Sequence, residues 1–368
     1  MRVLGFMSGT SLDAVDMAVL DTDGETITAF GPAGERKLSE ATRALALAAT
    51  EAAKGWPRGA AEPAEFAPAA EAVAREHFEA AAAFLAANGL SWGEIELIGF
   101  HGQTVLHERP TADRIGRTVQ LGDGALLAKL SETPVAFDFR TADVAAGGEG
   151  APLAPIYHLA RAQASGVAPP SAVLNVGGVA NITLFSTTAD PLAFDTGPGN
   201  GMIDLLVQAR GLGRYDVDGR LAAAGRVNAD VLAGYLAHPY FRQAPPKSLD
   251  RFDFSLDALK GLSSEDAAAT LVAFTAEAIR LGLDAAPERP RVLIVSGGGR
   301  SNPQIMHAIA ERAGCEVVAA EAVGWRGDAI EAEAFAYLAA RTKRGLPISF
   351  PGTTAAPQPM TGGRIVEP

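Results

Sequence analysis

Three glycine-bearing turns constrain the fold of this chain more than any other feature of its sequence. Each directly follows a short apolar segment: Gly9-Thr10-Ser11 follows residues 3–6, Gly177-Gly178 follows residues 172–176, and Gly297-Gly298-Gly299 follows residues 291–295. Glycine leaves backbone N–H groups unobstructed, so turns of this kind suit a polyphosphate. One such turn alone is more often a tight turn that needs glycine, but three in the same setting favour nucleotide binding. Neither a dinucleotide-type GxGxxG nor a GxxxxGK[ST] segment accompanies them, which argues against Rossmann and P-loop folds.

The segments between these turns predict an α/β chain with a coarse internal repeat. Residues 3–6 and 14–20 predict a β-hairpin around the first turn, and residues 172–176 and 182–185 predict another around the second. Further strands are expected at 95–100, 134–139, 192–194 and 291–295, and helices at 40–88 with a break at 55–63, 201–210, 267–283 and 329–342. The last residues, rich in Pro, Gly and Thr, look irregular.

The repeat predicts two similar lobes. We place an N-terminal lobe over residues 1–138 and a C-terminal lobe over residues 139–368, with the boundary close to the glycine-rich residues 147–150. This division is also compatible with a C-terminal segment that packs back on the first lobe. A chain of 368 residues also exceeds the size at which one hydrophobic core keeps growing, which favours two lobes with a cleft between them.

Charge and cysteine content narrow the class of protein. The 43 acidic and 31 basic residues give a net charge of −12, which argues against a nucleic-acid partner or an anionic membrane surface. Cys315 is the only cysteine, so neither an intrachain disulfide nor a cysteine metal cluster is expected. The sequence has no signal-peptide pattern and no run of about twenty apolar residues. We therefore expect a cytoplasmic protein without a membrane span, and a homodimer is compatible with the sequence.

Six short segments point to a family. In chain order they are MSGTSLD (7–13), HGQT (101–104), DFR (138–140), AAGGEGAPL (145–153), LNVGGVAN (174–181) and FDTGPGN (194–200). Two lobes with glycine phosphate turns are typical of the superfamily of sugar kinases, actin and the heat-shock chaperones. The six segments in this order resemble the signatures of the anhydro-N-acetylmuramic acid kinases along almost the whole chain. The resemblance implies an α/β, two-lobe, actin-like ATPase (ribonuclease H-like) fold with an interlobe cleft.

The resemblance also implies a reaction in bacterial cell-wall recycling. ATP and water would convert 1,6-anhydro-N-acetylmuramic acid to N-acetylmuramic acid 6-phosphate and ADP. The substrate's O6 is tied to C1 and carries no proton, so a base must activate water against C1 while O6 takes the γ-phosphate. Two other functions remain open from the residues alone. One is a kinase for an ordinary hexose or carboxylate, and the other is a nucleotide-dependent sensor or chaperone-like binding protein that transfers no phosphate.

Two carboxylates are the candidate catalytic residues. Asp195 resembles the family's base, and its place at the end of a predicted strand, before Gly-Pro-Gly, would hold it rigidly. The structural alternative is a cap for the helix that follows Gly201, although Asp195 lies far upstream for capping. Glu331 matches the family's glutamate, which holds the same water or a sugar hydroxyl. Its structural alternative is an acid stabilised by the dipole at a helix N-terminus.

The remaining candidates bind ligands. The glycine turns and the resemblance together assign ATP binding to Gly9, Thr10, Ser11, Leu12, Asp13, Ala14, Val15, Asp16, Asn175, Gly177, Gly178, Gly297, Gly298 and Gly299. Sugar binding is assigned to His101, Thr104, Arg140 and Asn200, and Mg²⁺ to Asp13 and Asp16 through water. A guanidinium can bind the sugar's lactyl carboxylate with two hydrogen bonds, but an interlobe ion pair is an alternative for Arg140. His101 has the alternative of a structural hydrogen-bonding role.

The chain departs from the family pattern at three places. Ala14 stands where glycine is usual, and Phe100 replaces a small residue before HGQT. Both changes leave the polar atoms of their segments in place. The segment PKSLDR (246–251) differs from the commoner PKSTGR, which puts in doubt any substrate contact of that loop beyond Lys247 and Ser248.

Overall fold

The chain forms two compact units in the computed structural model, which describes residues 1–9, 12–111, 113–249, 253–327 and 329–368. Unit 1 comprises residues 1–164 and 328–368, and unit 2 comprises residues 165–327. The division falls after residue 164, whereas the sequence suggested a boundary after residue 138. The physical reason is that the glycine-rich residues 147–150 are not a linker. They turn back on unit 1, where the Gly148 N–H donates to the Asp143 carbonyl and the Gly150 N–H donates to Asp143 Oδ2.

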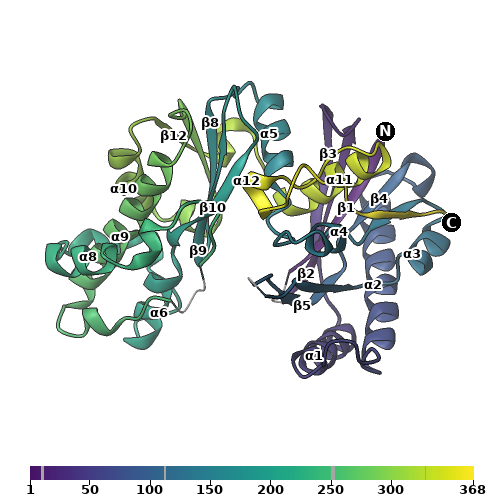
Figure 1. Ribbon diagram of the computed structural model, residues 1–368, viewed down its shortest axis with the longest axis horizontal. Coiled ribbons are helices and arrows are strands. Elements are labelled where there is room, and N and C mark those ends of the chain that lie inside the picture. Colours follow the sequence, from purple (N-terminus) through teal and green to yellow (C-terminus); the bar gives the residue numbers. More distant parts are fainter. Residues whose placement is uncertain (10–11, 112, 250–252, 328) are drawn as a thin grey trace. The chain divides into compact units, whose positions relative to one another are not determined.

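Unit 1 is built on a six-stranded sheet (Figure 1). Its strands are β1 (Arg2–Ser8), β2 (Ala14–Thr22), β3 (Ile27–Lys37), β4 (Leu97–Phe100), β7 (Val135–Phe137) and β13 (Arg364–Val366), in the order β13-β7-β4-β1-β2-β3. Strands β1, β2 and β3 are antiparallel neighbours, while β4 and β7 run parallel to β1. Strand β13 pairs antiparallel with β7, so the C-terminal residues expected to be irregular supply an edge strand.

Unit 2 repeats this arrangement on five strands. They are β8 (Ser171–Val176), β9 (Val179–Phe185), β10 (Leu192–Pro198), β11 (Val292–Ser296) and β12 (Glu316–Ala319), in the order β10-β9-β8-β11-β12. Again the first three strands are antiparallel and the last two run parallel to the first. When the strands of each sheet are counted along the chain, both sheets contain the order third, second, first, fourth, fifth. This duplicated order confirms the α/β, actin-like (ribonuclease H-like) fold expected from the sequence.

Helices flank both sheets (Figure 1). Unit 1 contains α1 (Glu40–Lys54), α2 (Phe66–Ala87), α3 (Gly124–Ser131), α4 (Thr141–Ala145), α5 (Pro155–Ala164), α11 (Ile330–Lys343) and α12 (Pro351–Thr354), with a two-stranded sheet of β5 (Gln103–Glu108) and β6 (Arg117–Leu121). Unit 2 contains α6 (Gly201–Ala209), α7 (Arg220–Ala224), α8 (Ala229–Leu236), α9 (Ser264–Asp284) and α10 (Pro303–Ala313). The helices predicted around 40–88, 201–210, 267–283 and 329–342 are therefore confirmed, including the break at 55–63.

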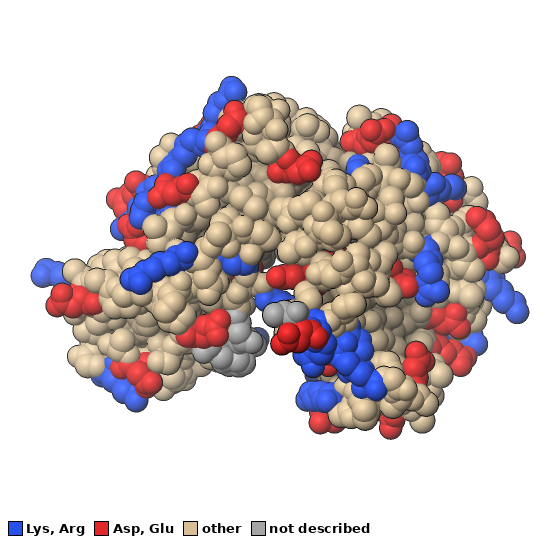
Figure 2. Space-filling model, viewed as in Figure 1, with Lys and Arg blue, Asp and Glu red and all other residues tan. Residues whose placement is uncertain are grey.

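The face of the molecule in Figure 2 carries charged side chains of both signs. On the face shown in Figure 2, basic and acidic side chains lie interspersed among uncharged ones, so the acidic excess does not gather in a single patch there. Among the described residues, no helix combines the length and the apolar character that crossing a membrane requires.

Helix α11 lies unusually close to the sheet of unit 1. A Cβ atom on Gly5 of β1 would lie 2.0 Å from the carbonyl oxygen of Ala332, and one on Gly99 of β4 would lie 2.2 Å from that of Phe335. The helix contributes small, fully buried residues to this contact, such as Ala336 and Ala339. Two glycines on neighbouring strands thus let the helix backbone rest on the sheet, and this contact fixes where the first turn of α11 presents its side chains.

The close approach makes a testable prediction. Gly5→Ala should lower the free energy of unfolding by about 1–3 kcal/mol, because the added methyl group overlaps backbone atoms that have little room to move. Gly55→Ala is the matched control, since Gly55 has a negative φ and a Cβ there would have no atom within 4 Å. Urea unfolding followed by circular dichroism measures both changes. Equal midpoints for the two variants would contradict the packing argument.

Candidate active site

The carboxyl ends of three parallel strands bring predicted site residues of unit 1 together. Strands β1, β4 and β7 are neighbours, and the residues just beyond their ends include Gly9, His101 and Arg140. Gln103 joins the first two segments, because its Nε2 donates a hydrogen bond to the Gly9 carbonyl at 3.2 Å. The strand-end position predicted for these residues is therefore observed, in keeping with ligand sites in open α/β sheets.

Arg140 is held on two sides by uncharged acceptors. Its Nε and Nη2 both donate to His101 Nε2, at 3.1 and 3.0 Å, and its Nη1 donates to the Gly150 carbonyl at 2.8 Å. Burial lowers the pKa of Arg140 to about 10, against the opposing effect of Glu331 and Asp143. The guanidinium therefore stays charged near neutral pH. Within the described residues, no carboxylate lies within ion-pair distance of it, so its charge is available to an anion.

His101 supports Arg140 with its ring. The side chain is only 3% exposed and packs against Phe335 of α11, with ring centroids 4.5 Å apart. Burial, and to a smaller extent Arg140, hold the pKa of His101 well below its usual value. A neutral ring whose Nε2 accepts from Arg140 carries its proton on Nδ1. This geometry favours the structural alternative for His101, in which it orients Arg140.

The protonation state of His101 can be tested by NMR. We expect the ring to stay neutral, with its proton on Nδ1, as the pH is lowered from 8 through the usual histidine range, because protonation would break the hydrogen bonds from Arg140. The depressed pKa also means that His101 stabilises the fold above the unfolded-state pKa of about 6.5, and that this stability is lost as the pH falls below it. Long-range ¹H–¹⁵N spectra, assigned with His101→Gln, measure the tautomer. A titration midpoint near 6.5 would refute this arrangement.

Glu331 and Thr104 lie on other elements of unit 1. Glu331 occupies the first turn of α11 and is exposed to solvent, yet the surrounding protein removes enough water to raise the pKa of its carboxyl, with Arg140 acting in the opposite direction. This electrostatic coupling links Glu331 to the Arg140 site. Thr104 lies on β5, where its Oγ1 accepts a hydrogen bond from Gln120 at 3.4 Å.

The first glycine turn is described only in part, because Thr10 and Ser11 lie outside the described residues. Leu12 and Val15 are 4% and 0% exposed, so these two predicted ATP contacts have only backbone atoms to offer. Asp13 is exposed in the bend before β2, and Asp16 lies within β2 beside Ala14 and Val15. Among the described residues, no group of three His, Cys, Asp or Glu side chains forms a metal cluster, so a magnesium ion here would depend on few carboxylates and on water.

The other two glycine turns meet in unit 2. Strands β8 and β11 are parallel neighbours with Ser296 opposite Asn175, so the turns that follow them lie side by side. A Cβ on Gly297 would lie 2.4 Å from Asn175 Oδ1, and Gly299 packs against Val176. In contrast, a Cβ on Gly178 or Gly298 would have no atom within 4 Å. Gly178 and Gly298 therefore face open space, as a phosphate cradle requires, while Gly297 and Gly299 permit close packing.

Asn200 joins the same cluster through its backbone. Its N–H donates to the Gly177 carbonyl at 2.8 Å, and its Nδ2 donates to Asp204 Oδ2 at 3.0 Å. Partial burial raises the pKa of Asp204 to about 6. A cavity of about 250 Å³ adjoins these segments and is lined by residues that include Gly178, Pro198, Asp204 and Leu249. The predicted substrate residue Asn200 thus lies beside the second glycine turn.

Asp195 lies inside a strand, not at its end. Strand β10 continues to Pro198, with an irregularity in its pairing between Asp195 and Gly197, because Gly197 and Pro198 still pair with β9 instead of turning. The loop before residue 250 holds Asp195 from two sides: its N–H donates to the Lys247 carbonyl at 2.9 Å, and its Oδ2 accepts from the Leu249 N–H at 2.8 Å. Both loop contacts use backbone atoms, so Leu249 in place of the commoner threonine does not remove them.

Sequence reasoning named Lys247 but missed Tyr240 and the contacts that both residues make near Asp195. Tyr240 donates its hydroxyl proton to the Asp195 carbonyl, and Lys247 Nζ donates to the Tyr240 carbonyl at 3.1 Å. Burial lowers the pKa of Lys247. The proline and lysine of the segment 246–251 were the only local sign that this loop matters. Its hydrogen bonds to β10 join residues about fifty positions apart, so no local pattern predicts them. Asp143 and Gln103 of unit 1 were also missed as partners of predicted residues.

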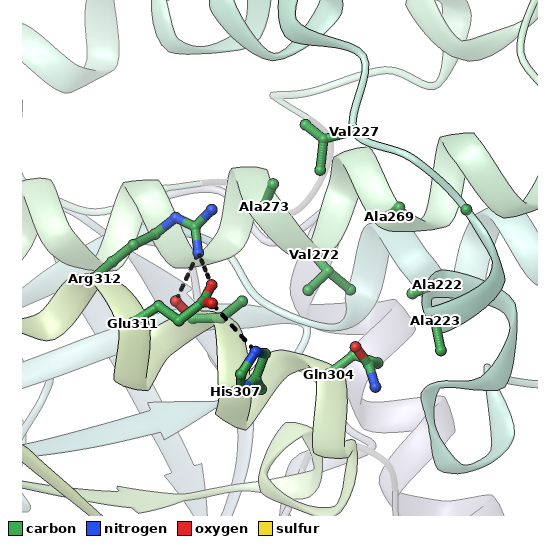
Figure 3. A pocket seen from close by; sticks show the side chains of 12 residues that line it. Ala222, Ala223, Val227, Ala269, Val272, Ala273, Gln304, His307, Glu311 and Arg312 are labelled. Carbon is green, nitrogen blue, oxygen red and sulfur yellow. Dashed lines mark hydrogen bonds and ion pairs between the residues drawn. The ribbon is translucent and has the colours of Figure 1, made fainter.

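A second cavity in unit 2 contains none of the predicted residues. It has a volume of about 210 Å³ and lies among α7, α9 and α10, with Ala222, Val272 and Gln304 in its wall (Figure 3). Its charged side chains already pair with one another: His307 and Arg312 both contact Glu311 at 3.2 Å. The cavity therefore offers little unpaired charge to a ligand.

Comparison with known proteins gives matches along the entire chain. A family model described as anhydro-N-acetylmuramic acid kinase matches residues 1–368. A protein of that name from Caulobacter vibrioides is 69% identical over 366 residues, covering 100% of this chain and 99% of that protein. Another from Phenylobacterium zucineum is 68% identical over 368 residues, covering 100% of both. One from Brucella anthropi is 52% identical over 364 residues, covering 99% of this chain and 98% of that protein.

Proposed function

We propose a function for this chain from one premise: it belongs to the anhydro-N-acetylmuramic acid kinase family. It is an ATP-dependent kinase that converts 1,6-anhydro-N-acetylmuramic acid and water to N-acetylmuramic acid 6-phosphate in cell-wall recycling. The observation that carries the proposal is the match over the whole chain, which covers both units and every predicted site segment. The two alternative functions, an ordinary hexose kinase and a sensor without phosphoryl transfer, are less consistent with this family match. A cytoplasmic location fits an ATP-consuming enzyme with a single cysteine.

The chemistry requires one bond to break on each substrate. The oxygen of water forms a bond to C1 as the C1–O6 bond breaks, and O6 takes the electron pair. O6 then bonds to the γ-phosphorus, the bond from that phosphorus to the β–γ bridging oxygen breaks, and ADP leaves with the electron pair. One proton of the water must be accepted by a base, and the other stays on the new C1 hydroxyl.

Asp195 is the residue we assign to that proton. A base must be held firmly to act within hydrogen-bond reach of its target. The contacts of Asp195 with Lys247, Leu249 and Tyr240 fix its backbone and one carboxylate oxygen, Oδ2. Glu331 is the second catalytic candidate, and we assign it to orienting a sugar hydroxyl. Loss of water around its carboxyl raises the pKa of Glu331, and Arg140 acts in the opposite direction.

The glycine turns are the assigned phosphate site. The open positions of Gly178 and Gly298 fit a polyphosphate, because a Cβ at either position would have no atom within 4 Å, which leaves room for a ligand to approach the backbone. Asp13 and Asp16 are the residues that would hold Mg²⁺ through water, and the ion would supply positive charge to the phosphate oxygens. Arg140 is assigned to the lactyl carboxylate, since it keeps its charge and retains N–H donors beyond its three protein contacts.

The role of Asp195 gives a kinetic prediction. Asp195→Asn should lower kcat about a hundredfold or more while leaving the KM values for ATP and sugar within a small factor, because the amide keeps the shape of the carboxylate but cannot accept the proton. Asp257→Asn, a change of an exposed acid elsewhere in unit 2, is the matched control. Coupled ADP-release assays measure both variants. Near-normal turnover of Asp195→Asn would remove the assignment.

The path of the water oxygen tests the proposed reaction as a whole. In water labelled with oxygen-18, the label should appear on C1 of the phosphorylated sugar, because cleavage of C6–O6 would leave no oxygen on C6 to receive phosphate. Mass spectrometry of the product, before anomeric exchange removes the label, gives the answer. Glucose is the control substrate and should yield no sugar phosphate. Label in inorganic phosphate would indicate simple ATP hydrolysis, and a phosphorylated sugar with an intact anhydro ring would indicate an ordinary kinase.

A further inference from the structure

A buried carboxylate outside the predicted site connects three separate segments of unit 1. Asp143 of α4 is 2% exposed. Its Oδ1 accepts hydrogen bonds from Ser349 Oγ at 2.5 Å and Thr354 Oγ1 at 2.7 Å, and its Oδ2 accepts from the Gly150 N–H at 2.6 Å. A carboxylate this far from water is tolerated only when its oxygens are well supplied with donors. The C-terminal residues 349–354 are thereby tied to the glycine-rich loop 147–150.

The glycines of that loop are explained by its contact with Asp143. A Cβ on Gly148 would lie 2.3 Å from Asp143 Oδ2, so any side chain there would displace the carboxylate. The Gly148 N–H also donates to the Asp143 carbonyl at 2.9 Å. Gly150 has a φ of +74°, a left-handed conformation that favours glycine. The segment AAGGEG therefore wraps around Asp143. This contact gives the motif a role, whereas the assignments of the phosphate site and of the base had given it none.

Gly150 transmits this arrangement to Arg140. On one side its N–H donates to Asp143, and its carbonyl accepts from Arg140 Nη1 at 2.8 Å. His101 holds the opposite side of the guanidinium. Arg140 has five N–H donors, of which these contacts use three. The direction in which the other two point depends on the orientation of Gly150, and hence on Asp143.

We propose that Asp143 is the positioning residue of Arg140, and that the C-terminal residues Ser349 and Thr354 help to select a carboxylate-bearing sugar through it. Asp143 does not touch the substrate. It holds Gly150 so that the remaining N–H groups of Arg140 face the lactyl carboxylate. This inference rests on the proposed function, in which Arg140 binds that carboxylate.

A positioning role and a purely structural role predict different kinetics. If Asp143 only stabilises unit 1, its loss lowers the unfolding midpoint and affects all substrates alike. If it positions Arg140, its loss weakens binding of sugars that carry the carboxylate and spares those that lack it. The comparison therefore needs two sugars: 1,6-anhydro-N-acetylmuramic acid, and 1,6-anhydro-N-acetylglucosamine, which has no lactyl group.

The experiment measures KM and kcat for both sugars and for ATP in the full-length enzyme. Asp143→Asn and Thr354→Val should raise the KM for the lactyl sugar, by about tenfold for the first variant, and leave the KM for ATP and for the sugar without the lactyl group within twofold. Thr354→Ser should restore wild-type values, since it keeps the hydroxyl. Thr353→Val is the matched control, because Thr353 is equally buried on α12 but bonds to Phe350 instead of Asp143. Thr354→Val carries the test if Asp143→Asn does not fold.

Arg140→Met separates this inference from the proposed function. If Arg140→Met removes the preference for the lactyl sugar and the folded Asp143 and Thr354 variants keep it, the positioning role is wrong and the function stands. If Arg140→Met leaves the preference unchanged, the assignment of Arg140 itself fails, and the inference fails with it. Equal losses for both sugars in Thr354→Val, or the same loss in Thr353→Val, would also overturn the positioning role.

Discussion

The parallel pairing of a few central strands is the constraint on which the rest of the structure depends. In unit 1 the ladder places Phe6 opposite Phe100, and Phe100 opposite Phe137. In unit 2 it places Ser296 opposite Asn175. Parallel neighbours end at the same edge of a sheet, so loops that are far apart in sequence meet there. The gathering of Gly9, His101 and Arg140, and separately of Gly178 and Gly298, follows from this pairing.

A second constraint is the close packing of one long helix against each sheet. In unit 1 the glycines Gly5 and Gly99 admit the backbone of α11. In unit 2 the contact between α9 and β10 uses glycine on both sides: a Cβ on Gly197 would lie 2.7 Å from Ala278, and one on Gly282 would lie 2.5 Å from Thr196. Because packed interiors leave little free volume, such contacts leave a helix few alternative positions. Glu331 on α11 and Asp195 on β10 are both presented by elements fixed in this way.

The sequence allowed prediction of what is encoded locally. Local sequence determines the apolar strands that end in glycine turns and the break at 55–63 between two helices. The structure contains both features. The extension of β10 through Asp195 was not predicted, because Gly-Pro-Gly is typical of a turn and only the pairing with β9 makes it a strand. The unit boundary was misplaced for a similar reason, since residues 147–150 have the composition of a linker. Asp143 was missed because its partners Ser349 and Thr354 lie more than 200 residues away, and such hydrogen bonds leave no local pattern.

The surroundings of Arg140 illustrate how a protein can keep a half-buried cation ready for an anionic ligand. A carboxylate in direct contact would stabilise the guanidinium, but it would also neutralise the charge that a ligand needs. Here the direct partners are a neutral imidazole and a peptide carbonyl. Asp143 acts from one residue further away, where it opposes the lowering of the Arg140 pKa and orients the carbonyl without occupying a donor. This arrangement offsets part of the desolvation cost of the cation while its remaining donors stay uncommitted, which suits a site whose ligand brings the matching negative charge.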